Sequence, residues 1–77
     1  MKTLQLYSRP GCHLCDRMEA DLAPIVAGAA RLEIVDISED PALLRRYGLR
    51  IPVLAAGGLE LSGYPLDVSR VLTYLAS

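Results

Sequence analysis

Residues 2–15 read KTLQLYSRPGCHLC, and this stretch decides the fold class of the chain. Alternating leucines predict a strand over about residues 2–7. The Ser-Arg-Pro-Gly run that follows is a breaker cluster, and apolar side chains then recur every three or four positions over residues 14–26, as on one face of a helix. The two cysteines, Cys12 and Cys15, therefore lie where a strand gives way to a helix.

The rest of the chain predicts three more strands and two more helices. Residues 31–37 are apolar and β-branched, which is typical of a mostly buried strand. An Asp-Pro start and a glycine end delimit a short helix over residues 40–48. Residues 51–55 and 59–61 flank a Gly-Gly pair, which indicates a hairpin, and apolar spacing predicts a last helix over about residues 65–75.

The predicted order of elements is β-α-β-α-β-β-α. A strand, helix, strand start requires a right-handed parallel crossover, and the final hairpin adds an antiparallel edge. We therefore expect an α/β fold in which three helices flank a four-stranded mixed sheet, all within a single domain of residues 1–77. Pro24 lacks a backbone donor, so we expect the first helix to kink or end there.

Composition argues against several function classes. The net charge of -1 gives no strong field for nucleic acid or an anionic membrane surface. The N-terminal residues contain no continuous apolar stretch of the kind that a secretion signal or a membrane span needs. We therefore expect a cytoplasmic protein, and in that reducing compartment a cysteine pair is more often catalytic or metal-binding than structural.

The spacing of Cys12 and Cys15 suits a redox-active dithiol. Residues at i and i+3 of a helix have Cβ atoms roughly 5–6 Å apart, and a disulfide needs about 3.8 Å, so little adjustment closes the bond. A loop this small removes little chain entropy, which makes the bond a poor staple. At the helix start, unpaired N–H groups and the nearby Arg9 favour a Cys12 thiolate. We expect Cys12 to attack and Cys15, one turn further in, to resolve.

Other interpretations of the pair stay open. A zinc ion bound within one chain needs four ligands, and His13 is the only other cysteine or histidine, so we expect no such metal. A metal or cluster shared between two chains needs fewer ligands from each. Two inert core cysteines would suit a buried strand better than a helix start. His13 is most simply an exposed side chain, although its protonation would tune the dithiol beside it.

The CxxC after the first strand and the later Arg50-Ile51-Pro52 segment make the chain resemble the glutaredoxin branch of the thioredoxin fold. The resemblance covers essentially all 77 residues and is strongest to short bacterial glutaredoxin-like proteins. It implies that the Ile51-Pro52 bond is cis and lies beside the dithiol, with the Ile51 backbone free to pair with an extended peptide or glutathione. It also implies a monomer without a bound cofactor that uses glutathione as co-substrate, with Arg9 among the binding residues.

The segment from residue 62 to 67 departs from the family pattern. Glutaredoxins bind a glutathione carboxylate through Gly-Gly-x-Asp, and here Gly63 and Asp67 are the candidates for those roles while Pro65 removes one backbone donor. The Ser-Gly-aromatic-x-x-Asp run instead resembles small redoxins that reduce ribonucleotide reductase and draw electrons from thioredoxin reductase. Tyr64 is either a substrate-facing ring or a cover for the edge of the core.

These observations predict a thiol-disulfide oxidoreductase that reduces protein disulfides or glutathione mixed disulfides. One alternative is a small redoxin that depends on thioredoxin reductase. Another is a module in which two chains and two glutathiones hold a [2Fe-2S] centre through Cys12. A domain that only binds other proteins is a further alternative, but it would not need Cys15.

Overall fold

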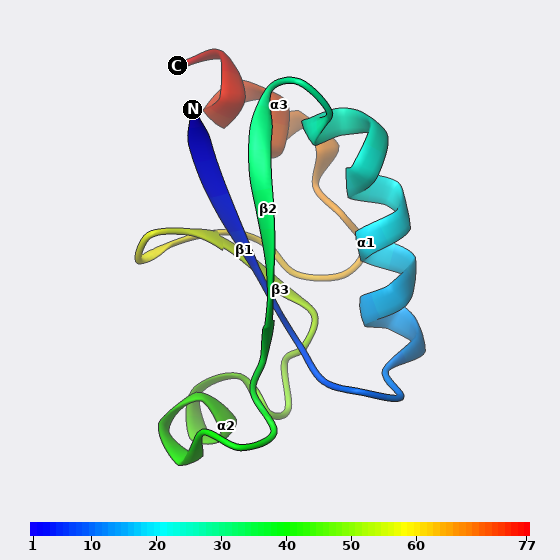
Figure 1. Cartoon of the computed structure of the whole chain (residues 1–77), viewed down its shortest axis with the longest axis vertical. Helices are drawn as coiled ribbons and strands as arrows, with labels where there is room; N and C mark the ends of the chain where they lie inside the picture. The colour runs from blue at the N-terminus through cyan, green and yellow to red at the C-terminus, as the bar shows by residue number, and fades with distance from the viewer.

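The computed structural model describes residues 1–77 and arranges them as a four-stranded mixed sheet with three helices (Figure 1). The elements are β1 (Lys2–Ser8), α1 (His13–Val26), β2 (Ala30–Asp36), α2 (Pro41–Tyr47), β3 (Val53–Ala56), β4 (Leu59–Ser62) and α3 (Val68–Ala76). Their order confirms the predicted fold class. None of the helices is long and apolar enough to cross a membrane.

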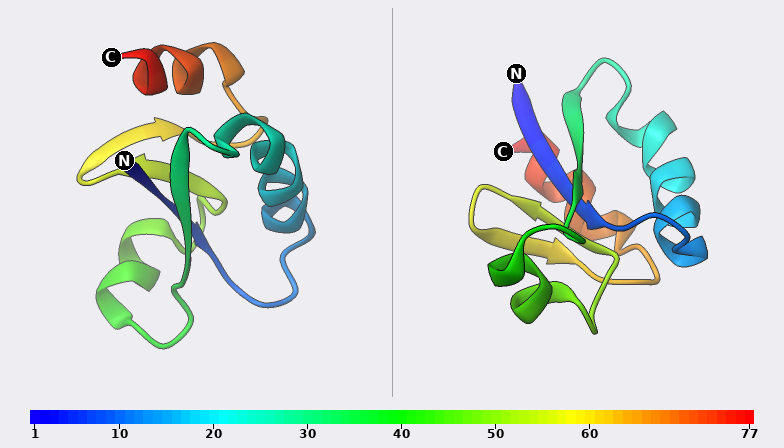
Figure 2. Two further views of the ribbon diagram at one scale, coloured as in Figure 1. Left: turned by 45° about the horizontal axis from the view of Figure 1, so that its top comes forward. Right: turned by 60° about the horizontal axis from the view of Figure 1, so that its bottom comes forward.

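The sheet has the strand order β2-β1-β3-β4. β1 pairs with β2 in parallel and with β3 antiparallel, and β3 pairs antiparallel with β4. Because β1 and β2 are parallel, α1 is the crossover between them. Figure 2 shows α1 and α2 on opposite sides of the sheet. The carboxyl ends of the parallel strands β1 and β2 therefore lie side by side, at the end of the sheet where α1 begins.

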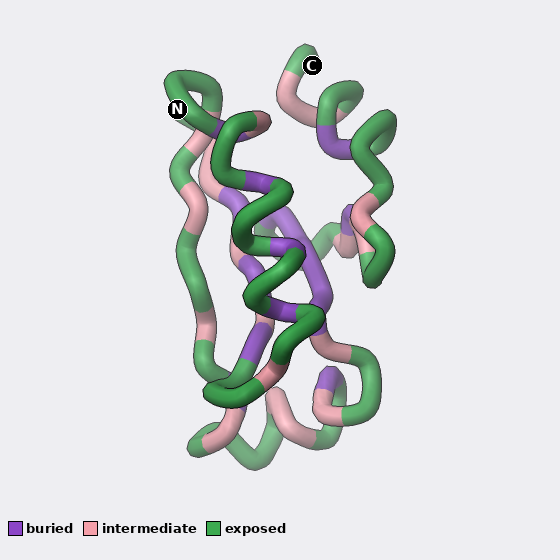
Figure 3. The backbone as a smooth tube through the Cα atoms, turned by 90° about the vertical axis from the view of Figure 1, so that its right-hand side faces the viewer, coloured by how far each residue is buried: buried purple, intermediate pink, exposed green.

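The larger core lies on the face of the sheet that α1 and α3 cover. Met18, Leu22 and Val26 recur every fourth residue along α1, and this buried stripe is visible at successive turns in Figure 3. The stripe packs on Leu4 and Leu6 of β1, both fully buried. A smaller core on the opposite face joins α2 to β3 through Ile37, Tyr47 and Val53. The site described below lies at the N-terminus of α1, before the residues of this helix that pack in the larger core.

Two sequence-based expectations need correction. β2 is not mostly buried: it is an edge strand with one neighbour, its side chains are half-buried or exposed, and Ile34 is 47% exposed. The last helix begins at Val68 rather than at residue 65, because the Asp67 side chain caps it by accepting the Arg70 N–H. The apolar pattern located both elements in the sequence. The burial of β2 depends on its neighbours in the sheet, and the first residue of α3 depends on which side chain caps it, and both are set by the fold.

Pro24 lies inside α1, which continues for two more residues to Val26. The chain turns soon afterwards at Gly28, whose φ of +74° is a conformation that favours glycine. A proline this close to the C-terminus of a helix removes one hydrogen bond from the last turns, and the helix ends within the following turn. The first helix therefore ends just beyond the expected position.

Candidate active site

The site begins at the loop that joins β1 to α1. Gly11 takes a φ of +82° in the turn, a left-handed conformation that places the next residue at the head of the helix. Cys12 is the N-cap of α1, with extended backbone angles of -90° and 103°. Its Sγ accepts a hydrogen bond from the backbone N–H of Cys15 at 3.2 Å. The sulfur thus occupies the position in which a serine or aspartate oxygen caps other helices.

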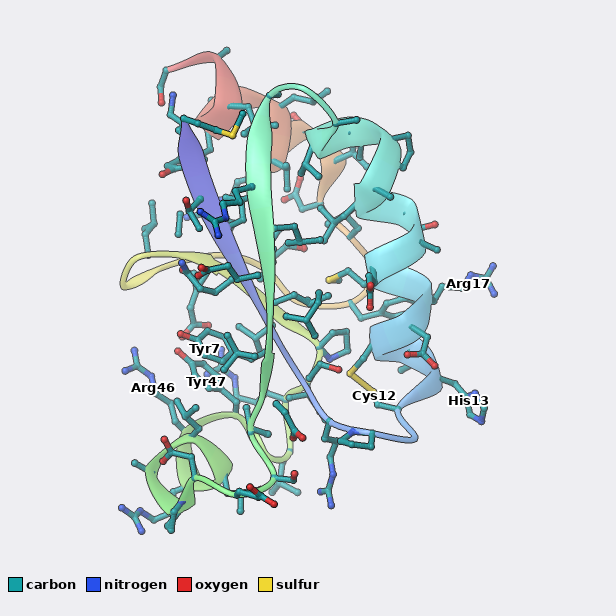
Figure 4. The ribbon with its side chains drawn as sticks, in the orientation of Figure 1. Tyr7, Cys12, His13, Arg17, Arg46 and Tyr47 are labelled. Atoms are coloured by element: carbon teal, nitrogen blue, oxygen red, sulfur yellow. A yellow bond between two sulfur atoms is a disulfide. The ribbon has the colours of Figure 1, made fainter.

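Cys12 and Cys15 form a disulfide, with Cα atoms 5.2 Å apart (Figure 4). The two cysteines differ in exposure. Cys15 is only 1% exposed and belongs to the buried side of α1, whereas Cys12 is half-buried. Cys12 is therefore the more accessible of the two cysteines.

His13 projects away from the sheet, as does Arg17 one turn later (Figure 4). His13 is exposed, and its ring makes no hydrogen bond within the molecule. It lies beside Cys12 along the chain but on a different side of α1 from the disulfide. This placement suits an influence on the dithiol through charge better than a direct proton transfer to either sulfur.

The Ile51–Pro52 peptide bond is cis, and Pro52 is buried. Ile51 packs against the smaller core around Tyr47. The rings of Tyr47 and Tyr7 stack with centroids 4.3 Å apart, as Figure 4 shows. Burial of its hydroxyl, followed by the nearby Tyr47, raises the pKa of Tyr7. This cluster fixes the chain segment that leads into β3.

A hollow of about 420 Å³ lies between β4 and the start of α3. It brings together three of the predicted substrate residues, Gly63, Tyr64 and Asp67, and Tyr64 is 40% exposed there. The Asp67 carboxylate accepts from the backbone N–H of Arg70 at 3.0 Å, and the Asp67 N–H donates to Ser62 Oγ at 2.9 Å. The backbone N–H of Asp67 and one oxygen of its carboxylate are thus already engaged by the protein itself.

Arg9 is not part of that hollow. It lines a second one of about 220 Å³ between α1, β2 and the end of β1. Three carboxylates line the same space, from Asp16, Glu19 and Asp36. The pKa of the Asp36 carboxyl is lowered, first by the hydrogen bond from the Ser38 hydroxyl, then by the Ser38 backbone N–H, with Arg9 contributing.

Sequence reasoning missed Asp16 and Glu19. The available signal was their spacing, since they lie four and seven residues after Cys12 and so share its flank of the helix. The structure therefore separates the predicted binding residues into two hollows, and neither Ile51 nor Pro52 lines either of them. No group of three or more His, Cys, Asp or Glu side chains is placed to hold a metal ion.

The sheet order and the cysteine pair at the N-terminus of α1 are those of the thioredoxin-like class of folds. A family model described as glutaredoxin-like domain (DUF836) matches residues 3–76, and the chain belongs to this family. No curated protein matches the chain significantly.

Several solved structures are similar to this chain. Protein XcR50 from X. campestris is 42% identical, with 95% of each chain covered and a TM-score of 0.75. Protein Ne2328 from Nitrosomonas europaea is 37% identical over 95% of this chain and 89% of that one, with a TM-score of 0.85. A buckwheat glutaredoxin in complex with glutathione is 20% identical over 91% of this chain and 64% of its own, with a TM-score of 0.57, and shares the fold.

Proposed function

We propose that this protein is a thiol-disulfide oxidoreductase that reduces protein disulfides or glutathione mixed disulfides through Cys12 and Cys15. The observation that carries the proposal is the position of Cys12, whose Sγ caps α1 by accepting the Cys15 N–H and which is the more exposed of the two bonded cysteines. Backbone N–H groups at a helix start stabilise negative charge, so the same geometry favours a thiolate when the disulfide is open.

The reaction follows from this geometry in two steps. The Cys12 thiolate attacks one sulfur of the substrate disulfide, a bond forms between them, and the other substrate sulfur leaves as a thiolate that takes a proton. The Cys15 thiol then loses its proton to solvent and attacks Cys12 Sγ. That attack forms the Cys12–Cys15 disulfide and releases the second substrate thiol, so two electrons pass from the protein to the substrate. A reducing thiol or dithiol returns them.

Glutathione is our first candidate for the electron donor, supported by membership of a glutaredoxin-like family and by the shared fold of the buckwheat complex. The hollow beside β4 supports a second candidate, a thioredoxin reductase. There Pro65 has no N–H, the Asp67 N–H is taken up by Ser62, and the Asp67 carboxylate caps α3. Fewer free groups remain for a glutathione carboxylate than in the family's usual Gly-Gly-x-Asp pattern.

The test measures NADPH consumption with the oxidised protein as acceptor, in two parallel assays. One contains glutathione and glutathione reductase, and the other contains thioredoxin reductase alone. The control is Cys12→Ser, which leaves no second cysteine to form an alternative disulfide because the chain has only two. Turnover in the first assay supports glutathione as donor, and turnover in the second supports the reductase.

Turnover in neither assay would contradict the proposed function. The protein purified anaerobically would then be examined for visible absorption, because a brown dimer with glutathione would indicate a [2Fe-2S] module instead. A colourless protein without turnover would indicate a domain that only binds partners.

A further inference from the structure

The smaller hollow is lined in part by Arg9 and Pro10, which belong to the loop that leads to Cys12. Asp16 and Glu19 line it from α1, and both share a flank of the helix with Cys12. At a rise of about 1.5 Å per residue, they lie roughly 6 Å and roughly 10 Å from Cys12 along the helix axis. A substrate side chain bound in the hollow would therefore lie within a few residues, along the substrate chain, of the substrate cysteine that bonds to Cys12.

The hollow has a net negative charge. Asp36 adds a third carboxylate from the end of β2, and Arg9 is the only cationic side chain in the lining. The single ion pair of the molecule joins Arg50 to Glu60 at the other side of the sheet. Asp16, Glu19 and Asp36 thus have no cation within the 4 Å of an ion pair, and the lining has two more negative charges than positive ones.

Ser8 supplies a second, independent observation. It is 8% exposed, it lines the hollow from the end of β1, and its hydroxyl takes part in none of the side-chain hydrogen bonds of the molecule. Every polar side-chain atom that is fully inaccessible to solvent has a hydrogen-bond partner. Because the Ser8 hydroxyl has no such partner, it must be accessible, and the space that it meets is the hollow. No protein group pairs with this hydroxyl, so it is free to accept from a ligand with N–H donors in place of water.

We propose that this hollow binds the side chain of a lysine or arginine of the substrate protein, close to the cysteine that Cys12 attacks. The inference rests on the proposed function and names the substrate class: disulfides or mixed disulfides whose cysteine has a basic neighbour. The ammonium or guanidinium group donates to the Ser8 hydroxyl and is held by the carboxylates of Asp16 and Glu19, with Asp36 at the far wall. An extended chain advances about 3.3 Å per residue, so a basic residue two or three positions from the cysteine reaches the hollow.

A free metal ion fits these residues less well than a basic side chain. The three carboxylates line one hollow, but no group of three metal-binding side chains comes close enough together to coordinate an ion. A guanidinium or ammonium on a flexible stem spreads its donors over a wider space and tolerates the nearby Arg9 at the rim.

The test uses three homodimeric peptide disulfides in which the residue two positions on either side of the cysteine is Lys, Gln or Glu. The fully reduced protein is mixed with each, and the second-order rate of Cys12–Cys15 oxidation is measured. Rates with dithiothreitol in place of the protein correct for the intrinsic reactivity of each peptide. We expect the corrected rate to be about tenfold higher for the Lys peptide than for the Glu peptide, and this ratio to fall with added salt.

Variants locate the effect. Glu19→Gln and Asp16→Asn should each reduce the corrected Lys-to-Glu ratio by a factor of about three, and Glu19→Lys should invert it. Ser8→Ala should reduce the rate for the Lys peptide alone. The matched control is Asp21→Asn, which removes an exposed carboxylate from the same helix outside the hollow and should leave the ratio unchanged.

The outcomes distinguish the two proposals. Oxidation by the Gln peptide at a rate well above that of dithiothreitol supports the proposed function regardless of charge preference. Equal corrected rates for all three peptides, or an equal response to Asp21→Asn and Glu19→Gln, would overturn the basic-side-chain site and leave the proposed function intact. Failure of every peptide to react would contradict the proposed function itself and, with it, this inference.

Discussion

The three helices of this protein begin in the same way but with different atoms. α2 and α3 are capped by carboxylates: Asp40 accepts from two backbone N–H groups, of Ala42 and Leu43, and Asp67 accepts from one. α1 is capped by a sulfur, which accepts the Cys15 N–H at 3.2 Å. A carboxylate is charged across the physiological pH range, whereas Cys12 can be a disulfide sulfur, a thiol or a thiolate.

The difference shows how the N-cap position of a helix can also hold a reactive group. An aspartate cap strengthens its helix in a fixed way, because its charge is always present. At the head of α1 the strength of the cap depends on the state of Cys12, and the helix in turn favours the charged state. The redox centre therefore lies at the one helix start where the cap is able to change.

The largest expected effect separates the two roles of Cys12. Cys12→Ser should lose all turnover, to the rate of the blank, because oxygen is a poor nucleophile toward disulfides. It should keep α1 intact, because serine is a good N-cap. The measurements are the NADPH assay and circular dichroism, and a variant that loses helix content would show that the sulfur is needed for the fold as well.

The next largest effect concerns the carboxylate caps. Asp40→Ala should lower the free energy of unfolding by about 1–2 kcal/mol, because it leaves two N–H groups of α2 without a partner. Denaturant unfolding of the reduced protein measures it, with Asp40→Asn as the control that restores most of the loss. An equal stability of the alanine and asparagine variants would contradict the role of the cap.

A smaller effect tests the cap at α1. Cys12→Ala should be less stable than Cys12→Ser by about 1 kcal/mol, since both lack the disulfide and only the serine can accept the Cys15 N–H. The same denaturant experiment measures the difference. If the two variants unfold together, the Cys12 position does not act as a cap once the disulfide is absent.

The smallest effect extends the comparison to a strand end. Asp36 accepts from the N–H and hydroxyl of Ser38, and its pKa is lowered as a result. A lowered carboxyl pKa adds stability at pH values above the usual value of about 4, and this stability is lost as the pH falls through the lower, folded-state pKa. Asp36→Asn should therefore lower the melting temperature slightly at pH 7 and converge with the parent at acidic pH. Ser38→Ala should weaken the same pH dependence, and a difference that persists at low pH would contradict the assignment.

The sequence was enough to predict the order of elements, the dithiol and the more buried position of Cys15, because strand alternation, helical spacing and breaker residues are local signals. The exposure of β2 was not predictable, because apolar composition does not say whether a strand has one neighbour or two. The start of α3 was missed for a related reason. Asp67 and Pro65 are both acceptable starts, and the fold uses the aspartate.

The acidic hollow shows the same limit in the site. Asp16 and Glu19 were near Cys12 in the sequence, but Asp36 and Ser8 join them only because β1 and β2 are parallel and end together. Arg9 was predicted to bind glutathione, and in the structure it shares a hollow with three acidic residues, Asp16, Glu19 and Asp36. The topology of the fold brings residues of three elements together. The spacing of residues along one segment does not predict this.

The exposed edge of β2 also bears on how the protein behaves in a crowded solution. A free strand edge presents unpaired N–H and C=O groups on which a strand of another chain can add, the first step of aggregation. Along this edge Arg31, Glu33 and Asp36 are exposed, so an incoming strand would have to meet charges of both signs. The opposite edge, β4, is only four residues long, and its Glu60 is held by Arg50. The small sheet thus discourages uncontrolled association at both of its open edges without covering either of them.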